Sequence, residues 1–151
     1  MSKKIREWTR KFSAEYQNLN EVCEFVGEAA RECGFHSEEV YYVQAAVDEA
    51  FSNIVEHAVA DNVQEEIECT CRIDPTRFII SLSDYGNSFD PEQVPLPQVK
   101  APLHQREKGG LGLFFMRHWM DEINFNVIQD ENLECQRNVL TMIKKRTMTH
   151  D

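Results

Sequence analysis

The sequence predicts an α/β two-layer sandwich, in which helices cover one face of a mostly antiparallel sheet. Apolar residues recur at helical spacing in two early segments and one late segment. Short apolar runs of strand length lie before, between and after them. Helices grouped between strand pairs are typical of a layered domain. At 151 residues the chain fits one domain, expected to span residues 1–151.

The N-terminal part is expected to form an edge strand followed by a helix. Residues 4–13 alternate loosely between apolar and polar side chains, which favours a strand. Asn18 or Asn20 can cap a helix that runs to Cys33. Gly34 is suited to ending this helix, because glycine adopts the left-handed conformation found after helix C-termini.

A long second helix is expected from Ser37 to about Ala60. Ser37 is a natural N-cap, and acidic residues in the first turn suit the positive end of the helix dipole. The apolar residues that mark its buried side are Val43, Val47, Ala50, Ile54 and Ala58.

Four further strands complete the predicted sheet. Residues 65–73 and 77–83 are joined by a turn at 74–76 that is short enough for an antiparallel hairpin. Two final strands are expected at about 123–129 and 136–144.

A long loop is expected between the hairpin and the last helix. The stretch 91–108 holds four prolines and little periodicity. A loop of this length in a compact domain is usually a lid or a disordered segment. Lys100, Arg106 and Lys108 lie in it, either as ligands for phosphate or as solvated loop charges.

The most informative segment is DEAFSNIVEH, residues 48–57. It places Glu49, Asn53 and His57 on one face of the long helix, because residues four apart are neighbours. A carboxylate can accept a proton, and a carboxamide oxygen can meet a hard cation, so the pair suits a magnesium nucleotide. The alternative is a solvated helix face. His57 either orients this segment or packs against its surroundings.

A second segment, SLSDYGNSFDP, covers residues 81–91. It ends an apolar strand with Asp84-Tyr85-Gly86. An aspartate at a strand end can accept a hydrogen bond from an exocyclic amine, while glycine lets the backbone approach a planar ring. The alternative is an ordinary Asx-type turn.

A third segment, KGGLGLFFMRHWMDEINF, covers residues 108–125. Its glycines precede an apolar helical run at about 111–120. Glycines at a helix start let backbone N–H groups surround a phosphate, and the helix dipole favours the anion. The alternative is a hinge before a core helix.

In this order, the three segments resemble the N-box and the first and second glycine boxes of the GHKL ATPase superfamily. The branch that they resemble most is that of the anti-sigma-factor serine/threonine kinases, of the anti-sigma B type. The resemblance covers roughly residues 5–145. Ser88 stands where the first glycine box often has a second glycine, and Lys108 where histidine kinases usually have another glycine. The resemblance implies a Bergerat-type ATP-binding fold.

The resemblance also implies roles for individual residues. Glu49 would be the catalytic base, and Asn53 would bind the nucleotide through Mg²⁺. Asp84 would bind the adenine amine, with Gly86 beneath the ring. The residues implied around the phosphates are Lys108, Gly109, Gly110, Leu111 and Gly112.

As a member of this branch, the chain would bind ATP and Mg²⁺, sequester a sigma factor and phosphorylate a STAS-domain anti-anti-sigma protein. Relatives in this branch commonly form homodimers. The alternatives are a non-catalytic ATP- or ADP-binding module that inhibits its partner by contact, and the ATPase domain of a histidine kinase.

Composition fits a cytoplasmic regulator without direct nucleic-acid binding. The net charge of −10 argues against a basic face for nucleic acid and is compatible with a basic protein partner. The N-terminus has no apolar core of a signal peptide, and no run of residues is long and apolar enough to span a membrane. Five cysteines without a CxxC pair favour free thiols in a reducing compartment.

Overall fold

The computed structural model describes residues 5–60, 65–85, 116–130 and 135–146. The regular elements in these ranges are β1 (Arg6–Ser13), the 3₁₀ turn η1 (Tyr16–Asn18), α1 (Leu19–Glu32), α2 (Ser37–Ala60), β2 (Glu66–Ile73), β3 (Arg77–Tyr85), β4 (Glu122–Asp130) and β5 (Cys135–Lys145). Residues 116–119 are also helical. The expected lid at 91–108 lies outside the described residues.

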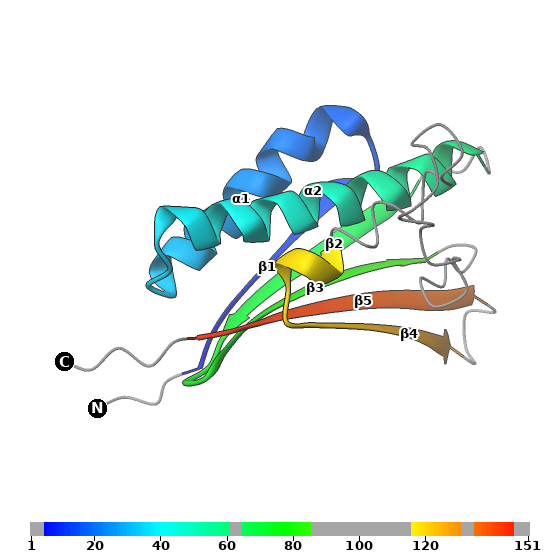
Figure 1. Cartoon of the computed structure of the whole chain (residues 1–151). Coiled ribbons are helices and arrows are strands. Elements are labelled where there is room, and N and C mark those ends of the chain that lie inside the picture. Colours follow the sequence, from blue (N-terminus) through cyan, green and yellow to red (C-terminus); the bar gives the residue numbers. More distant parts are fainter. Residues whose placement is uncertain (1–4, 61–64, 86–115, 131–134, 147–151) are drawn as a thin grey trace, which may run out of the picture.

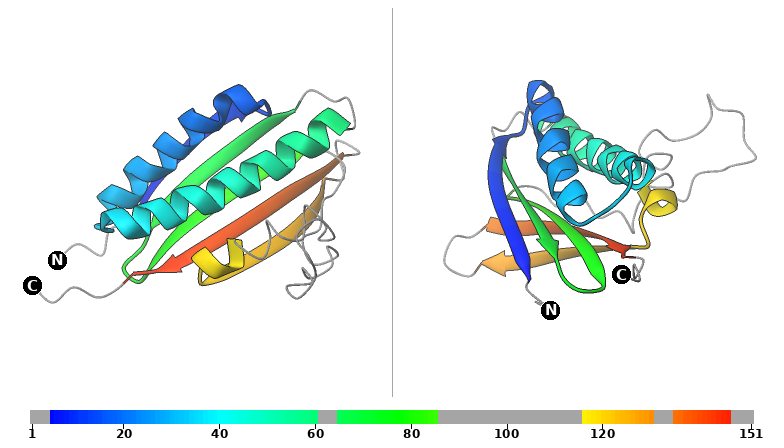
Figure 2. Two further views of the ribbon diagram at one scale, coloured as in Figure 1. Left: turned by 45° about the horizontal axis from the view of Figure 1, so that its top comes forward. Right: turned by 90° about the vertical axis from the view of Figure 1, so that its left-hand side faces the viewer.

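The strands form one sheet in the order β1–β2–β3–β5–β4, and every neighbouring pair is antiparallel. Figures 1 and 2 show α1 and α2 lying together on one face of this sheet. The two-layer α/β prediction is therefore confirmed, and so is β1 as an edge strand. The strand ends differ from the predicted ones by at most two residues.

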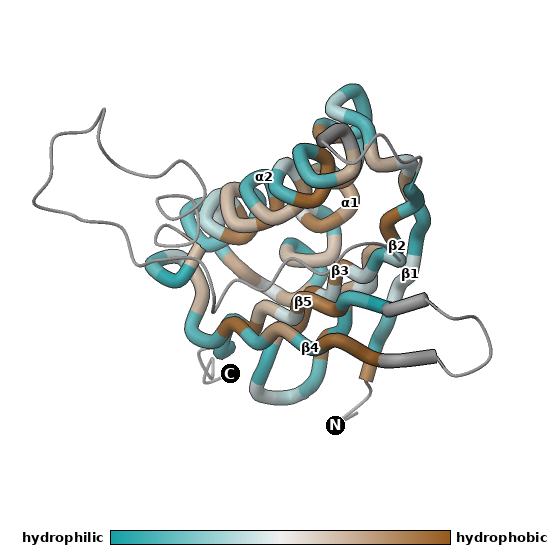
Figure 3. Tube along the Cα trace, turned by 90° about the vertical axis from the view of Figure 1, so that its right-hand side faces the viewer, coloured by the Kyte–Doolittle hydropathy of each residue, from teal (hydrophilic) through white to brown (hydrophobic). Residues whose placement is uncertain are grey.

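Alternation along the strands builds the core against the helices. The buried apolar side chains of β2 and β3 occupy every second position: Ile67, Cys69, Cys71, Ile73, Phe78, Ile80 and Leu82. Figure 3 shows hydrophilic and hydrophobic residues following one another along the strands. From α2, Val43, Val47 and Phe51 enter the same core and are fully buried. Each such side chain contributes about 1.5–3 kcal/mol by its burial, and together they fix α2 over the centre of the sheet.

The start of α1 differs in detail from the prediction. Asn18 is the cap residue, but its side chain makes no capping hydrogen bond. Its amide instead donates to the carbonyl of Ser13 at 2.9 Å. The turn η1 already brings the backbone into a helical conformation at Asn18, so the side chain is not in the extended geometry that capping needs. Gly34, with φ at 94°, follows the end of α1 as predicted.

The prediction that Ser37 caps α2 was wrong by one residue. The helix begins at Ser37, and the carbonyl of His36 accepts the first helical hydrogen bond, from Val40 at 3.0 Å. Glu39 then reaches back and accepts a hydrogen bond from the His36 backbone N–H at 3.1 Å. This bond is the half of a capping box in which the third helical residue accepts from the backbone N–H of the cap residue, here His36 in place of a serine.

The turn between β2 and β3 is organised by the carboxylate of Asp74. Its Oδ1 accepts hydrogen bonds from the backbone N–H groups of Thr76 at 2.9 Å and Arg77 at 2.6 Å, and Oδ2 accepts from the Arg77 guanidinium at 3.0 Å. Arg146, just after β5, donates to the carbonyls of Asp74 at 2.8 Å and Cys33 at 3.0 Å. These bonds tie the end of α1, the hairpin turn and the end of β5 together.

We expect Asp74→Asn to lower the free energy of unfolding by about 1–3 kcal/mol near neutral pH, the range for losing a hydrogen-bonded charge. Burial raises the pKa of Asp74, but the N–H groups of Thr76 and Arg77 and the Arg77 guanidinium outweigh burial and lower the pKa below the usual 3.8. A lowered pKa stabilises the fold above 3.8, and this stabilisation is lost as pH falls further. Urea unfolding should therefore show the difference between wild type and variant shrinking below about pH 4. A difference that stays constant with pH would contradict this role.

Candidate functional site

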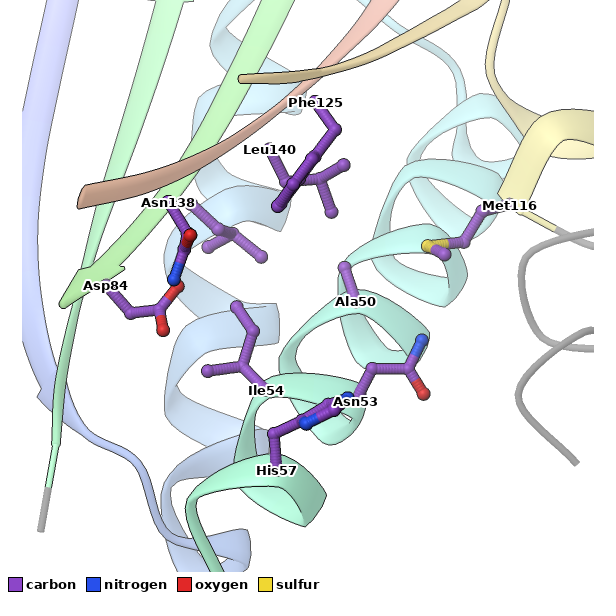
Figure 4. Close-up of a pocket in the computed structure, with 10 residues that line it drawn as sticks. Ala50, Asn53, Ile54, His57, Asp84, Met116, Phe125, Asn138 and Leu140 are labelled. Atoms are coloured by element: carbon purple, nitrogen blue, oxygen red, sulfur yellow. The ribbon is translucent and has the colours of Figure 1, made fainter. Parts of the chain in front are cut away.

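A small cavity lies between α2 and the end of the sheet where β3 finishes. Its walls are formed by Ala50, Asn53, Ile54, His57, Leu82, Asp84, Met116, Phe125, Asn138 and Leu140. Figure 4 shows the α2 residues on one side of this space and the residues of β3, β4 and β5 on the other. The cavity thus brings together side chains that are far apart in the sequence.

The α2 wall follows from helical periodicity. Ala50, Asn53, Ile54 and His57 recur at i, i+3, i+4 and i+7, so they share one face of the helix. Asn53 is only 8% exposed, and its amide nitrogen has no hydrogen-bond partner within the described part of the chain. His57 also lines the cavity, and its side chain is exposed.

The sheet wall is polar where β3 and β5 pair. Asp84 lies opposite Asn138 in the register of these strands, and the two side chains are 8% and 3% exposed. Figure 4 shows the carboxylate and the carboxamide facing each other. Burial raises the pKa of Asp84, while hydrogen bonds from the side chains of Asn138 and Glu65 and the charge of His57 act in the opposite direction. β3 continues to Tyr85, so Asp84 is held within the strand rather than in a turn after it.

The free space between the two walls is about 20 Å³. Pockets for drug-sized ligands are about 300–1,000 Å³, so the cavity as it stands admits no more than a water molecule. A planar base needs more room than this, and the larger apolar side chains of the lining are Met116 and Phe125. Both are flexible or apolar groups without hydrogen bonds that would resist a shift.

The sequence-predicted residues divide into three groups. Asn53 and Asp84 line the same cavity from opposite walls. Glu49 lies one helical turn before Asn53, is half-buried, and is not among the cavity-lining residues. The others lie outside the described residues: Gly86, Lys108, Gly109, Gly110, Leu111 and Gly112, together with Ser88.

Asn138 is the site residue that the sequence reading missed. Leu140 and Met142 are the buried, helix-facing residues of β5, and Asn138 continues their alternation by two positions. A carboxamide at a position that the strand pattern assigns to the core is a signal of a polar partner inside. This signal requires the register of β5, which the sequence alone did not supply.

The histidine kinase-like ATPase domain model matches residues 12–144 of the chain. The chain belongs to this family. The match runs from β1 to β5 and includes both walls of the cavity. The resemblance of the sequence to GHKL ATPases, and the α/β fold that it implies, are therefore confirmed.

Curated relatives are named as protein kinases. The chain is 35% identical over 103 residues to the serine-protein kinase RsbW of Oceanobacillus iheyensis, covering 64% of each protein. It is 33% identical over 78 residues to the serine/threonine-protein kinase BtrW of Bordetella bronchiseptica, covering 52% of this chain and 55% of that one. A third relative, RsbW of Bacillus velezensis, is 29% identical over 127 residues, covering 82% and 79%. The matched regions thus span less than two thirds of the first two relatives.

No helix in the described ranges is both long enough and apolar enough to cross a membrane.

Proposed function

We propose that this protein is an anti-sigma factor and a serine/threonine protein kinase that uses ATP and Mg²⁺. The observation that carries the proposal is the cavity that Asn53 on α2 and Asp84 on β3 both line. Family membership supports ATP binding in that cavity, and the names of the relatives support phosphoryl transfer to serine or threonine.

The residues present fit a magnesium nucleotide. Asn53 is buried with one end of its carboxamide unpartnered among the described residues. Rotating the carboxamide exchanges its oxygen and nitrogen, so that end can offer an oxygen to a hard cation. Asp84 offers a carboxylate to the amino group of adenine, with Asn138 holding it in place. Bound MgATP supplies the γ-phosphoryl group and the charge that neutralises it.

Glu49 is proposed as the base that takes the proton from the acceptor hydroxyl. It projects from the helix face of Asn53, one turn nearer the start of α2. Glu49 is half-buried and is not among the cavity-lining residues, so the proposal assigns it to the acceptor hydroxyl rather than to the base of the nucleotide. The segment 108–112 is proposed to surround the phosphates.

The proposed partners are a sigma factor and a STAS-domain anti-anti-sigma protein. One face of the kinase would sequester the sigma factor, and phosphorylation would release the antagonist. The proposal includes a single ATPase domain over residues 1–151, a cytoplasmic location and a homodimer. The net charge of −10 is compatible with a basic sigma factor as a partner.

The test uses partners captured from the source cell. The wild-type protein is incubated in lysate with ATP or ADP, and captured proteins are identified by mass spectrometry. Each purified partner is then incubated with γ-labelled ATP and Mg²⁺. Label on a serine or threonine of a STAS-domain partner supports the kinase. Nucleotide binding without transfer to any captured partner favours a non-catalytic module that inhibits by contact, which the position of Glu49 outside the cavity also permits.

We expect Asn53→Ala to weaken nucleotide binding more in Mg²⁺ than in EDTA, because the substitution removes the proposed metal ligand. The apo protein should be no less stable than wild type, since the buried amide that is lost has an unpartnered nitrogen. Calorimetry of ADP binding and thermal unfolding measure the two effects. Ser52→Ala is the matched control, because the half-buried Ser52 hydroxyl bonds Asp48 at 3.5 Å and does not line the cavity. An equal loss in Mg²⁺ and in EDTA would remove Asn53 from the metal role.

A further inference from the structure

The backbone of β1 presents hydrogen-bonding groups along the free edge of the sheet. It is the outermost of the described strands on its side, and Figure 2 shows it at that edge. The backbone N–H of Ala14, just after β1, donates to the carbonyl of Glu65 at 2.9 Å. Because the direction of bonding alternates along an antiparallel strand, the N–H and C=O groups of Glu7, Thr9 and Lys11 point away from β2. Such an edge is a template for another strand.

A hollow of about 370 Å³ lies beside this edge, between β1 and α1. Its lining includes the half-buried rings of Trp8 and Phe25 and the exposed carboxylate of Glu28. On β1, Trp8 alternates with Arg6 and Arg10, so the strand combines aromatic and basic side chains on the face that borders the hollow. A strand with the composition of β1 therefore complements the hollow in both charge and aromatic character.

The charges of β1 select one antiparallel register against a second copy of the same strand. With the two-fold axis at Thr9, Glu7 lies opposite Lys11 of the second copy on the open face of the sheet. On the helix-covered face, Trp8 lies opposite Arg10 of the second copy, whose guanidinium can stack on the indole. An axis at any other residue from 7 to 11 sets like charges opposite each other. Charges on an edge strand often block pairing, and here they leave a single register open.

We propose that two copies of this chain join their sheets through β1, antiparallel about a two-fold axis at Thr9. The proposal rests on the proposed function, which includes a homodimer, and it names the surface between the copies. Arg10 of the second copy would cover Trp8 beside Glu28, and the symmetry makes each contact twice. Arg10 bonds Glu21 within its own chain at 3.0 Å, but both side chains are more than half exposed. Such an exposed pair contributes little stability and leaves the guanidinium able to shift.

Analytical ultracentrifugation of the full chain measures the dissociation constant of the dimer. Glu7→Lys sets like charges opposite each other twice across the axis, so it should raise the Kd by about tenfold or more. Lys11→Glu should do the same. The double variant restores opposite charges in both pairs, and its Kd should return toward the wild-type value. A role of either residue within its own chain would give no such rescue.

Thr9→Pro tests the backbone pairing without removing a bond between β1 and β2. The N–H of Thr9 points to the free edge, and edge strands tolerate proline at such positions. The variant should be monomeric, and thermal unfolding checks that its fold is intact. Glu122→Lys is the matched control for the charge changes. Glu122 is exposed on β4, at the opposite edge of the sheet, so this variant should keep the wild-type Kd.

Three results would overturn the pairing of β1. A monomeric wild-type protein would overturn the homodimer and this interface with it. A dimer whose Kd is unchanged in Glu7→Lys and Thr9→Pro would place the interface on another surface. A double variant no tighter than the single ones would overturn the register at Thr9. Calorimetry of ADP binding tests the cavity of Asn53 and Asp84 separately, so failure of the interface and failure of the nucleotide proposal are distinguishable.

Discussion

Glu49→Gln should bind ATP within a few-fold of wild type and transfer almost no phosphate. Removing a positioned base typically costs about 10²–10⁴ in rate. Glutamine keeps the size and hydrogen-bonding capacity of glutamate but cannot take the proton of the acceptor hydroxyl. Because Glu49 lies outside the cavity that holds Asn53 and Asp84, nucleotide affinity should be nearly unchanged. The measurement is single-turnover transfer of labelled γ-phosphate to the captured STAS-domain protein.

Asp48→Asn is the matched control for this variant. Asp48 is the acidic residue next to Glu49 on α2, and its side chain is exposed. It accepts a hydrogen bond from the Ser52 hydroxyl. The Asp48→Asn substitution removes one negative charge from α2, as Glu49→Gln does. A purely electrostatic effect on ATP binding would therefore appear in both variants. Equal transfer by wild type and Glu49→Gln would exclude Glu49 as the base.

Asp84→Asn should lower ADP affinity by about 10- to 100-fold, the range for a hydrogen bond to a charged group. The amide nitrogen introduced at position 84 is a donor. It cannot accept the hydrogen bonds that Asn138 and the adenine amine donate to the carboxylate. The apo variant should unfold at the same or a higher temperature than wild type. The pKa of Asp84 is raised in the fold, so its ionised form destabilises the fold above that pKa, and asparagine removes this cost.

Calorimetry and thermal unfolding near neutral pH separate the two effects of Asp84→Asn. Loss of affinity without loss of stability would identify a residue kept for binding rather than for folding. Unchanged ADP affinity would refute the assignment of Asp84 to the base. A large loss of stability would instead indicate that the Asp84–Asn138 pair supports the sheet.

The sequence predicted the layers of the fold because periodicity is a local property. The apolar positions of α2, such as Val43, Val47 and Ile54, are buried as their spacing requires. The hairpin strands expected at 65–73 and 77–83 are present as β2 and β3. The motif carrying Asn53 and the strand carrying Asp84 were each recognisable within about ten residues, and these two residues line one cavity.

The features of the site that could not be predicted depend on pairing between strands that are far apart in the sequence. Asn138 becomes a site residue only when β5 pairs with β3 in the observed register, which places it opposite Asp84. The cap of α2 differed because the helix begins one residue earlier than a Ser37 cap requires, with Glu39 accepting from the backbone N–H of His36, and both starts are compatible with the same sequence.

The register of the outer strands has a practical consequence for protein engineering. Arg6, where β1 begins, pairs with Ile73, and Lys145, where β5 ends, pairs with Arg77. The start of β1 and the end of β5 therefore both lie beside the turn between β2 and β3. This turn is about 20–25 Å along β3 from Asp84. A reporter domain or surface tether joined before Arg6 or after Arg146 would start at the far end of the sheet, leaving the mouth of the cavity clear for single-molecule or immobilised binding assays.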